Sequence, residues 1–337
     1  MAQNKIGKQT LHFPSTPIIT SWASVVGPME GKGPLGEKYD LVLTDTLAGE
    51  KTWEKAEQKM MQFSIELALE KRNLLPKDLD FYLAGDLLNQ ITCANFTARF
   101  LNTPFLGLYG ACSTFAEGLC MAGVLLEGGF AEKVGVSASS HHDTAEKQFR
   151  TPTELGDQRP MTAQWTVTGS ASIIIEKTGT GIILTHATIG KIIDLGNSNA
   201  QDLGSAMAPA AFDTLKTHFE DLGRNENDYD LIVTGDLGLL GHGILKELLK
   251  EKGISPDRFN DCGIMVYSPE QDTHCGGSGC GCSGVVLTAH LIERLLSGYY
   301  HRILFIGTGA LLSPLTSLQG ETIPCIAHAV VLESRGE

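Results

Sequence analysis

Cys112 lies in the segment GLYGACSTFAEGL, between a short apolar stretch and a segment with a helix-like pattern. A thiol in the first turn of a helix meets the positive end of the helix dipole, which favours the nucleophilic thiolate. Free cysteines are also common as small buried residues. The local sequence therefore leaves two interpretations open: Cys112 acts as a nucleophile or ligand contact, or it packs in a tight turn.

A second small-residue segment, HCGGSGCGCSG, covers residues 274–284. It contains G-x-G-x-x-G, a pattern found in dinucleotide-binding loops, but no acidic residue closes the next apolar stretch to hold a ribose. His274, Cys275, Cys280 and Cys282 lack the paired spacing that is typical of zinc ligands. We therefore favour close backbone packing at this segment over a dinucleotide or metal site.

A long polar segment over residues 137–172 follows an apolar stretch. His141 and His142 are either solvated loop residues or donors that reach an anion in a cleft. Arg150 and Arg159 offer guanidinium groups that can bind a carboxylate through two hydrogen bonds. Asp86, after an earlier apolar stretch, is interpreted as a turn or helix-capping residue.

Three pairs of similar segments occur in the same order along the chain, which indicates an internal duplication. DFYLAGDL (80–87) matches DLIVTGDL (230–237), LLEGGFAEKVGVSAS (125–139) matches LLSGYYHRILFIGTG (295–309), and SASIIIE (170–176) matches AHAVVLE (327–333). Helical patterns over 52–73, 211–223 and 243–253 alternate with these apolar segments. Such alternation predicts βαβ units and mixed, mostly parallel sheets between helical layers.

The duplication predicts two similar α/β halves. It also predicts that the turn around Cys112 in the first half and the small-residue turn around Ser278 in the second half occupy equivalent positions. We place the halves at residues 1–178 and 179–337, with an insertion over about 137–170 in the first and the join near residues 177–181. In such folds ligands bind beyond the C-terminal ends of the strands. The segments around Cys112 and Ser278 are therefore expected to face one cleft.

The composition is that of a globular protein, with 42% hydrophobic residues in 337 and a formal net charge of −13. Phosphate backbones and anionic lipids both attract Lys and Arg clusters, so this charge argues against nucleic acid and against direct lipid docking. The first residues lack the apolar core of a signal peptide, and we expect a soluble protein that is not exported. Its eight cysteines are expected to be free thiols.

The two halves, the G-A-C-S turn and RPMTAQWTVTGSAS resemble the thiolase/ketoacyl synthase superfamily. GACSTFAEGL, SSHHDTAEKQFRTPTELGDQRP, DTHCGGSGCGCSG and GTGALLSPLTSLQGETIPCIAHAVVLES more narrowly resemble the stage V sporulation protein AD family. This resemblance implies a thiolase-like fold and a role in dipicolinic acid uptake into the developing spore. It also implies binding of that acid, alone or with calcium, and action with other stage V A proteins at the spore inner membrane. The superfamily suggests a homodimer; no cofactor or metal is expected.

The sequence departs from the superfamily pattern where a condensing enzyme needs a base for its thiol. Alignment with the thiolase G-H-P-x-G-x-S-G turn places Ser278 at the histidine, and the second-half strand end reads Thr234-Gly235-Asp236. Cys325 resembles the second thiolase cysteine, but C-I-A follows in place of C-x-G. Without an imidazole partner Cys112 cannot readily perform condensation. We interpret it as a remnant nucleophile in a binding pocket.

The predicted function is therefore non-catalytic dipicolinate binding. The predicted ligand contacts are Cys112, Ser113, His141, His142, Arg159, Thr234, Asp236, Gly277 and Ser278. One alternative is a Cys112-dependent acyltransferase that uses His141, His142 or His242 as its base. Another is a structural partner of membrane proteins with an empty pocket.

Overall fold

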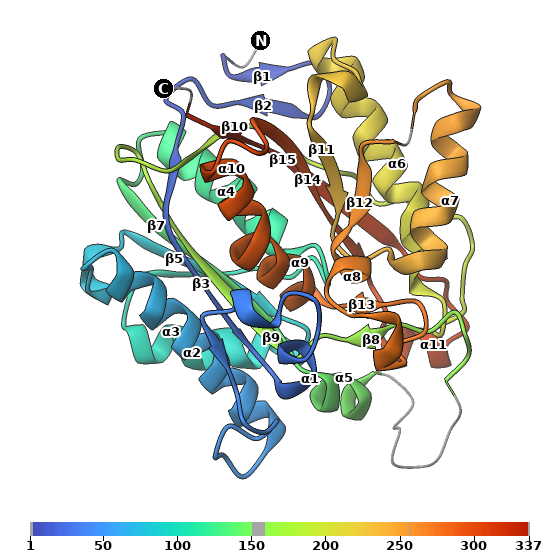
Figure 1. Ribbon diagram of the computed structural model, residues 1–337, viewed down its shortest axis with the longest axis horizontal. Coiled ribbons are helices and arrows are strands. Elements are labelled where there is room, and N and C mark those ends of the chain that lie inside the picture. Colours follow the sequence, from blue (N-terminus) through green and yellow to red (C-terminus); the bar gives the residue numbers. More distant parts are fainter. Residues whose placement is uncertain (1–2, 150–158, 256, 336–337) are drawn as a thin grey trace.

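The computed structural model describes residues 3–149, 159–255 and 257–335 (Figure 1). Within these residues thirteen strands form one sheet, whose main path runs β12-β11-β14-β15-β10-β3-β9-β7-β5-β6. The strands are β1 (Lys5–Ile6), β2 (Thr10–His12), β3 (Ile18–Val26), β4 (Leu41–Val42), β5 (Phe81–Asp86), β6 (Phe105–Gly107), β7 (Lys133–Ser140), β9 (Gly169–Glu176), β10 (Ile182–Thr188), β11 (Leu231–Thr234), β12 (Phe259–Asp261), β14 (Arg302–Ala310) and β15 (Cys325–Ser334). A separate pair joins β8 (Trp165–Thr166) to β13 (Gly277–Ser278).

The helices are α1 (Pro28–Gly31), α2 (Trp53–Lys71), α3 (Thr92–Leu101), α4 (Thr114–Glu127), α5 (His142–Gln148), α6 (Leu203–Leu222), α7 (Gly238–Glu251), α8 (Cys262–Met265), α9 (Cys280–Val286), α10 (Ile292–Leu296) and α11 (Pro314–Leu318). The long helices begin where the sequence supplies capping side chains. Thr52 accepts the Lys55 N–H at the start of α2, and Asp202 accepts the Ser205 N–H at the start of α6. Gly223, at φ +62°, ends α6 in the left-handed conformation.

The strand order has the symmetry that the repeated segments predict. Counting outward from the central β3–β10 pair, β9, β7, β5 and β6 on one side correspond to β15, β14, β11 and β12 on the other. The three pairs of similar sequences therefore occupy equivalent strands: β5 and β11, β7 and β14, β9 and β15. The predicted join falls between β9 and β10, and the division at residues 178 and 179 remains a prediction.

The sheet is mixed: its parallel strand pairs lie towards the two edges, and its antiparallel pairs lie at the centre. The outer strands β7-β5-β6 and β14-β11-β12 are parallel, as the βαβ pattern predicts. The central strands from β7 through β9, β3, β10 and β15 to β14 are antiparallel. The sequence pattern did not predict this antiparallel centre, because β9 and β15 are buried on both faces and show no alternation to distinguish strand direction.

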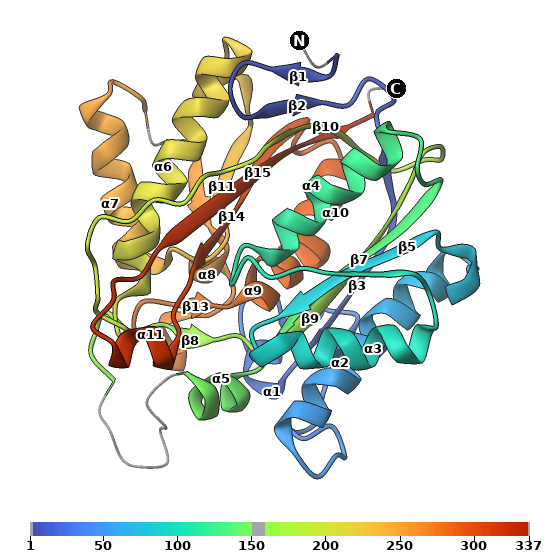
Figure 2. The same ribbon diagram turned by 180° about the vertical axis from the view of Figure 1, so that it is seen from behind.

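We call the strands β3-β9-β7-β5-β6 and β10-β15-β14-β11-β12 the two wings of the sheet. The helices lie in three layers, one on the outer face of each wing and one between the wings (Figures 1 and 2). α2 and α3 cover one outer face, α6 and α7 cover the other, and α4 and α9 lie between the wings. The middle helices are apolar on all sides because they pack against both wings, with Phe115 of α4 and Val285 of α9 in the largest core cluster. No helix within the described residues combines the length and the apolar composition needed to cross a membrane.

Candidate functional site

The turn that carries Cys112 is held in a strained conformation. Ala111 has a φ of +49°, a left-handed value that costs a non-glycine residue about 1–3 kcal/mol. The Ser113 hydroxyl donates to the Gly110 carbonyl at 2.7 Å, and the Thr114 hydroxyl donates to the Ala111 carbonyl at 2.7 Å. These bonds fix the turn and place Cys112, which is 6% exposed, one residue before Ser113, the N-cap residue of α4. The predicted helix-start position of Cys112 is therefore present.

Strand β14 of the second half approaches this turn through two glycines. A Cβ placed on Gly309 would lie 2.2 Å from the Gly110 carbonyl oxygen, and one on Gly307 would lie 2.6 Å from Cβ of Ala116. Only glycine permits so close an approach of two backbones. Thr308, between the two glycines, is thereby brought to the site from the other half of the chain.

Asp236 lies at the centre of the site as a buried carboxylate. Its oxygens accept the Gly279 N–H at 2.9 Å and the Thr308 hydroxyl at 2.7 Å. The side chains of Cys112 and Ser278 are also hydrogen-bonded to it. Burial raises the pKa of Asp236, while these donors oppose that rise. The structure thus brings together Cys112 and Ser278 from the two predicted turns and Asp236 from the second-half strand end; their role in ligand binding remains a prediction.

The cavity beside Cys112 is small, and the described residues that line it include no Arg, Lys or His. Its volume of about 20 Å³ has room for about one water molecule. Apart from Cys112, Ser278 and Tyr109, its lining residues within the described chain are apolar, and none is Arg, Lys or His. The Gly279 N–H at the start of α9, which could have met an anion, already binds Asp236. The described residues alone therefore give this cavity neither room nor a countercharge for a dicarboxylate, and the predicted ligand contacts here remain a prediction.

His141, His142 and Arg159 gather elsewhere, around α5 and Trp165. His141 caps α5: its Nδ1 accepts the Asp143 N–H at 3.2 Å and its Nε2 donates to the Thr46 carbonyl at 2.8 Å. Burial lowers the pKa of His141. The His142 ring stacks on Trp165 with 3.6 Å between ring centres. The structure therefore does not bring these histidines to the cavity of Cys112, and Arg150 lies outside the described residues.

Arg159 joins this second group of residues through two contacts. Its guanidinium carbon lies 4.7 Å from the centre of the Trp165 ring, and its Nη2 donates to the Asp272 carbonyl at 2.9 Å. Arg159 thus links the long segment of the first half to the 268–276 segment of the second half. It does not line the cavity of Cys112.

Beside Arg159 lies a larger cavity of about 300 Å³, at the lower end of the range for small-molecule sites, about 300–1,000 Å³. Leu239, Ile264 and Tyr267 give it apolar walls, and Thr273 and His274 add polar groups. His274 has a left-handed φ of +52°, and its Nδ1 donates to the Pro160 carbonyl at 2.8 Å. This site was not predicted, because the residues that form it come from three separate segments, at Met161, at Leu239 and over residues 264–276, without a shared motif.

The other predicted contacts serve the local structure. The Thr234 hydroxyl donates to Asp261 at 2.6 Å, and Asp261 also accepts the N–H groups of Leu237 and Gly238. Burial raises the pKa of Asp261 to about 7. A Cβ on Gly277 would lie 2.5 Å from Val266, so this glycine permits close packing. Thr234 and Asp261 together hold the turn from which Asp236 projects.

The structure also places His242 and the cysteines of the 274–284 segment, which we did not favour as a dinucleotide or zinc site. His242 lies on α7, where burial lowers its pKa to about 4, and it does not line the cavity of Cys112. The thiols of Cys275, Cys280 and Cys282 donate to three different carbonyl groups, those of Met161, Ser139 and Gly235. All eight cysteines are reduced thiols, as predicted, and all are buried.

Within the described residues, the one group with a metal-like spacing is Glu57, Asp86 and Cys93. Its carboxylates already have donors: Glu57 accepts the hydroxyls of Ser139 and Thr144, and Asp86 accepts the N–H groups of Leu88 and Ala94. The Leu88 bond makes Asp86 a turn residue, one of the two roles predicted for it, and Ala94 lies in the first turn of α3, whose N-cap residue is Ile91.

Comparison with known proteins connects this arrangement to one family. The family described as Stage V sporulation protein AD (SpoVAD) matches residues 7–333. The stage V sporulation protein AD of Bacillus subtilis (strain 168) is 48% identical over 331 residues, which cover 98% of each chain.

Solved structures with the same fold are enzymes of low sequence identity. The 3-oxoacyl-[acyl-carrier-protein] synthase III of Aquifex aeolicus VF5 aligns with a TM-score of 0.58 and 15% identity, over 94% of this chain and 99% of that one. A single-residue variant of OleA from Xanthomonas campestris aligns with a TM-score of 0.63 and 16% identity, over 95% and 99%. These likenesses confirm the predicted thiolase-like fold.

Proposed function

The chain belongs to the stage V sporulation protein AD family, which gives it a role at stage V of sporulation, and we propose that in this role it binds dipicolinic acid without catalysing a reaction. The observation that carries the proposal is that the side chains of Cys112 and Ser278 both hydrogen-bond to Asp236, while no imidazole lines that cavity within the described residues. A thiol that forms acyl intermediates needs a base and donors for the developing oxyanion. Here the donor at the start of α9 is engaged by Asp236.

We place the dicarboxylate in the 300 Å³ cavity beside Arg159 and His274 instead of in the cavity of Cys112. The larger cavity has room for a planar ring, with Ile264 and Tyr267 as apolar walls. The His274 ring lines this cavity, and the Arg159 guanidinium, which is bonded to the carbonyl of its lining residue Asp272, is the cation that we propose to meet a carboxylate there. Asp272, whose side chain is exposed at the edge of this cavity, could hold a calcium ion that accompanies the ligand.

The proposal extends to where the protein acts. Its partners are the other stage V A proteins, and it works at the spore inner membrane through them. The net charge of −13 supports attachment through partners over direct binding to anionic lipid.

Calorimetric titration with dipicolinate, with and without calcium, tests both the ligand and its place. Arg159→Ala and His274→Ala should each weaken binding about ten- to a hundredfold, because one charge-assisted hydrogen bond contributes about 1.5–3 kcal/mol. Cys112→Ala and Ser278→Phe, at the small cavity, should bind like the parent. Circular dichroism confirms folding of each variant. The opposite pattern, with binding lost only at Cys112 and Ser278, would return the ligand to the small cavity. No binding by the parent would overturn the function.

A further inference from the structure

Glu30, on α1, is a buried carboxyl group whose charge no cation balances. Its side chain is 1% exposed. One oxygen, Oε1, accepts the Thr168 N–H at 3.0 Å and the Tyr267 hydroxyl, and the other oxygen, Oε2, has no hydrogen-bond partner. Among the described residues no Lys, Arg or His forms an ion pair with Glu30. An ionised carboxylate is costly in such surroundings, which favours the neutral acid.

Burial accordingly raises the pKa of Glu30 from 4.5 to about 7, while the hydrogen bond from Tyr267 opposes the rise. Two more titratable groups face this carboxyl: Asp143 of α5, whose negative charge adds to the rise, and Tyr39, whose buried hydroxyl has no hydrogen-bond partner. Cys282 of α9 faces both tyrosines. Burial raises the pKa values of Tyr39, Tyr267 and Cys282 well above their usual range, so these three groups stay neutral. Glu30 is the member of this buried group that changes charge near neutral pH.

Tyr267 connects this carboxyl group to the 300 Å³ cavity. Tyr267 lines the cavity, and its hydroxyl donates to Glu30. Gln271 makes a second link between the same segment and α1, because its Nε2 donates to the Met29 carbonyl at 2.7 Å. Helix α1 therefore supports one wall of the cavity from behind, and a single tyrosine side chain links Glu30 to that wall.

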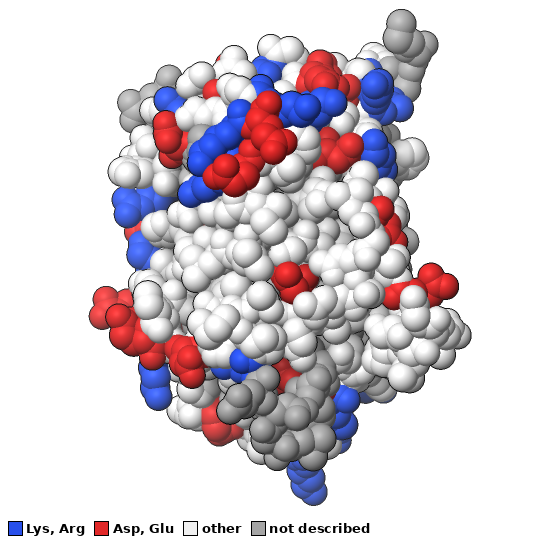
Figure 3. All heavy atoms as spheres, turned by 90° about the vertical axis from the view of Figure 1, so that its right-hand side faces the viewer, with Lys and Arg blue, Asp and Glu red and all other residues white. Residues whose placement is uncertain are grey.

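A dicarboxylate in the cavity changes the charge near Glu30, and the surface on this side offers little to offset the change. Leu239, in the first turn of α7, lines the cavity. Figure 3 shows the side of the molecule on which α7 lies: charged side chains crowd its upper edge, and a broad band below is almost free of charge. Arg159 is present in the empty and in the filled cavity alike, so binding itself adds two negative charges. These charges repel an ionised Glu30.

We propose that Glu30 couples ligand binding in this cavity to the uptake of a proton. The proposal rests on the function proposed above, which places a dicarboxylate in the cavity. The two added negative charges raise the pKa of Glu30 further, because like charges disfavour the ionised form. The filled cavity therefore holds a proton that the empty one releases as the pH rises through about 7. The affinity is highest below this pH and falls above it, so the ligand is taken up with a proton and is released towards alkaline pH.

Calorimetric titration with dipicolinate in the absence of calcium tests the proposal. Titrations at pH 7 in Pipes and in Bis-Tris, whose ionisation enthalpies differ, count the protons taken up on binding. The parent should take up about half a proton more per bound ligand than Glu30→Gln, and its affinity should fall about five- to tenfold more between pH 6 and pH 8. His274, which can also bind a proton, is the same in both proteins and cancels from the difference. Glu37→Gln, at an exposed position shortly after α1, should behave like the parent.

A second variant tests the link through the cavity wall. Tyr267→Phe keeps the ring and loses the hydroxyl that stabilises ionised Glu30, so its fall in affinity should move to a higher pH than in the parent. This variant also decides the question if circular dichroism shows that Glu30→Gln does not fold. Equal proton uptake by the parent and Glu30→Gln, or coincident pH profiles of the parent and Tyr267→Phe, would overturn the inference and leave the proposed function standing. No binding of dipicolinate by the parent would overturn both.

Discussion

The Cys112 thiol, at the start of α4 in the first half, shares a hydrogen bond with the Asp236 carboxylate, which follows β11 in the second half. The bond joins the turn of Cys112 to the segment after β11, and Asp236 is also bonded to Ser278 in the second turn that the duplicated sequence predicts to face the same cleft. It also sets the chemistry of the site, because a buried carboxylate stands where a condensing enzyme needs groups that activate the thiol and stabilise an oxyanion. The duplicated fold is thus retained, while the Cys112 and Asp236 side chains at its centre are hydrogen-bonded to each other.

This arrangement predicts that the protein does not turn over acyl-CoA thioesters. Release of free CoA from acetyl-CoA and from longer acyl-CoAs should not exceed the rate of the blank, and Cys112→Ala should give the same result as the parent. The physical reason is that Asp236 engages both the thiol and the Gly279 N–H. A spectrophotometric thiol assay measures the release. Turnover by the parent that disappears in Cys112→Ala would favour the acyltransferase alternative.

A second prediction concerns the contact between β14 and the turn of Cys112. Gly309→Ala should lower the free energy of unfolding by about 1–3 kcal/mol, because the new Cβ would meet the Gly110 carbonyl oxygen and one backbone must move. Gly243→Ala on α7 is the matched control, since it has open space at its Cβ and should gain about 0.4–1 kcal/mol. Urea unfolding measures both. Equal stability of the two variants would show that the close approach at Gly309 relaxes without cost.

Much of the fold could be predicted from the sequence because its signals are local and repeated. The Gly-Asp pairs at Asp86 and Asp236 lie at or just after the ends of the equivalent strands β5 and β11, and Cys112 lies just before a helix, as its turn predicts. The site was harder to predict, because its contacts join segments that no local pattern connects. Thr308 reaches Asp236 only through the glycines of FIGTGA, a spacing that could have marked a close approach.

The contacts of the histidines in the 137–172 segment could not be predicted from the sequence either. His141 has the residue type of an anion donor, and the sequence alone could not reveal that its two ring nitrogens are engaged in capping α5 and in binding the Thr46 carbonyl. Partners so distant in the chain are determined by tertiary packing. For that reason the residue types of the site were easier to predict than their contacts.

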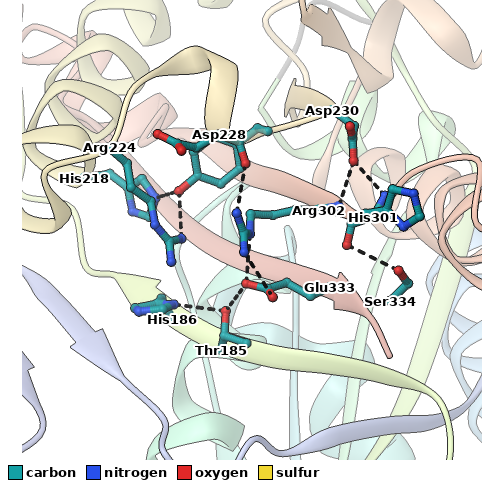
Figure 4. Close-up of polar contacts among 11 residues, drawn as sticks. Thr185, His186, His218, Arg224, Asp228, Asp230, His301, Arg302, Glu333 and Ser334 are labelled. Carbon is teal, nitrogen blue, oxygen red and sulfur yellow. Dashed lines mark hydrogen bonds and ion pairs between the residues drawn. The ribbon is translucent and has the colours of Figure 1, made fainter. Parts of the chain in front are cut away.

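A third prediction follows from His218, a buried histidine in the group of polar residues that Figure 4 draws. His218 hydrogen-bonds Thr188 and Tyr229 at 2.6 Å each, and burial, with the nearby Arg224, lowers its pKa from 6.5 to about 3. The unfolded chain therefore binds more protons between these pH values. The contribution of His218 is complete above pH 6.5 and is lost by about 1.4 kcal/mol per unit as the pH falls towards 3.

His218→Gln should remove this slope, so that between pH 7 and pH 5 the variant loses about 2 kcal/mol less stability than the parent. His301→Gln is the control, because His301 is exposed in the same region. Urea unfolding at pH 7, 6 and 5 gives the three profiles. A parent and a His218→Gln profile that run parallel would mean that His218 accepts its proton without disturbing the fold.

The fourth prediction concerns the opposite limb of the pH profile and arises from Glu57 on α2. Burial, with the nearby Asp86 carboxylate, raises the pKa of Glu57 from 4.5 to about 8, while the hydroxyls of Ser139 and Thr144 oppose the rise. The folded protein therefore holds a proton that the unfolded chain releases between these pH values. Glu57 therefore lowers the free energy of unfolding by about 1.4 kcal/mol per pH unit as the pH rises from 4.5 to 8.

Glu57→Gln, which cannot ionise and can still bond both hydroxyls, should remove that loss and should be more stable than the parent at pH 8. Glu70→Gln, at an exposed position on the same helix, should follow the parent. Thermal unfolding across pH 5–9 measures the difference, and a Glu57→Gln profile parallel to that of the parent would show that Glu57 is ionised in the folded protein throughout.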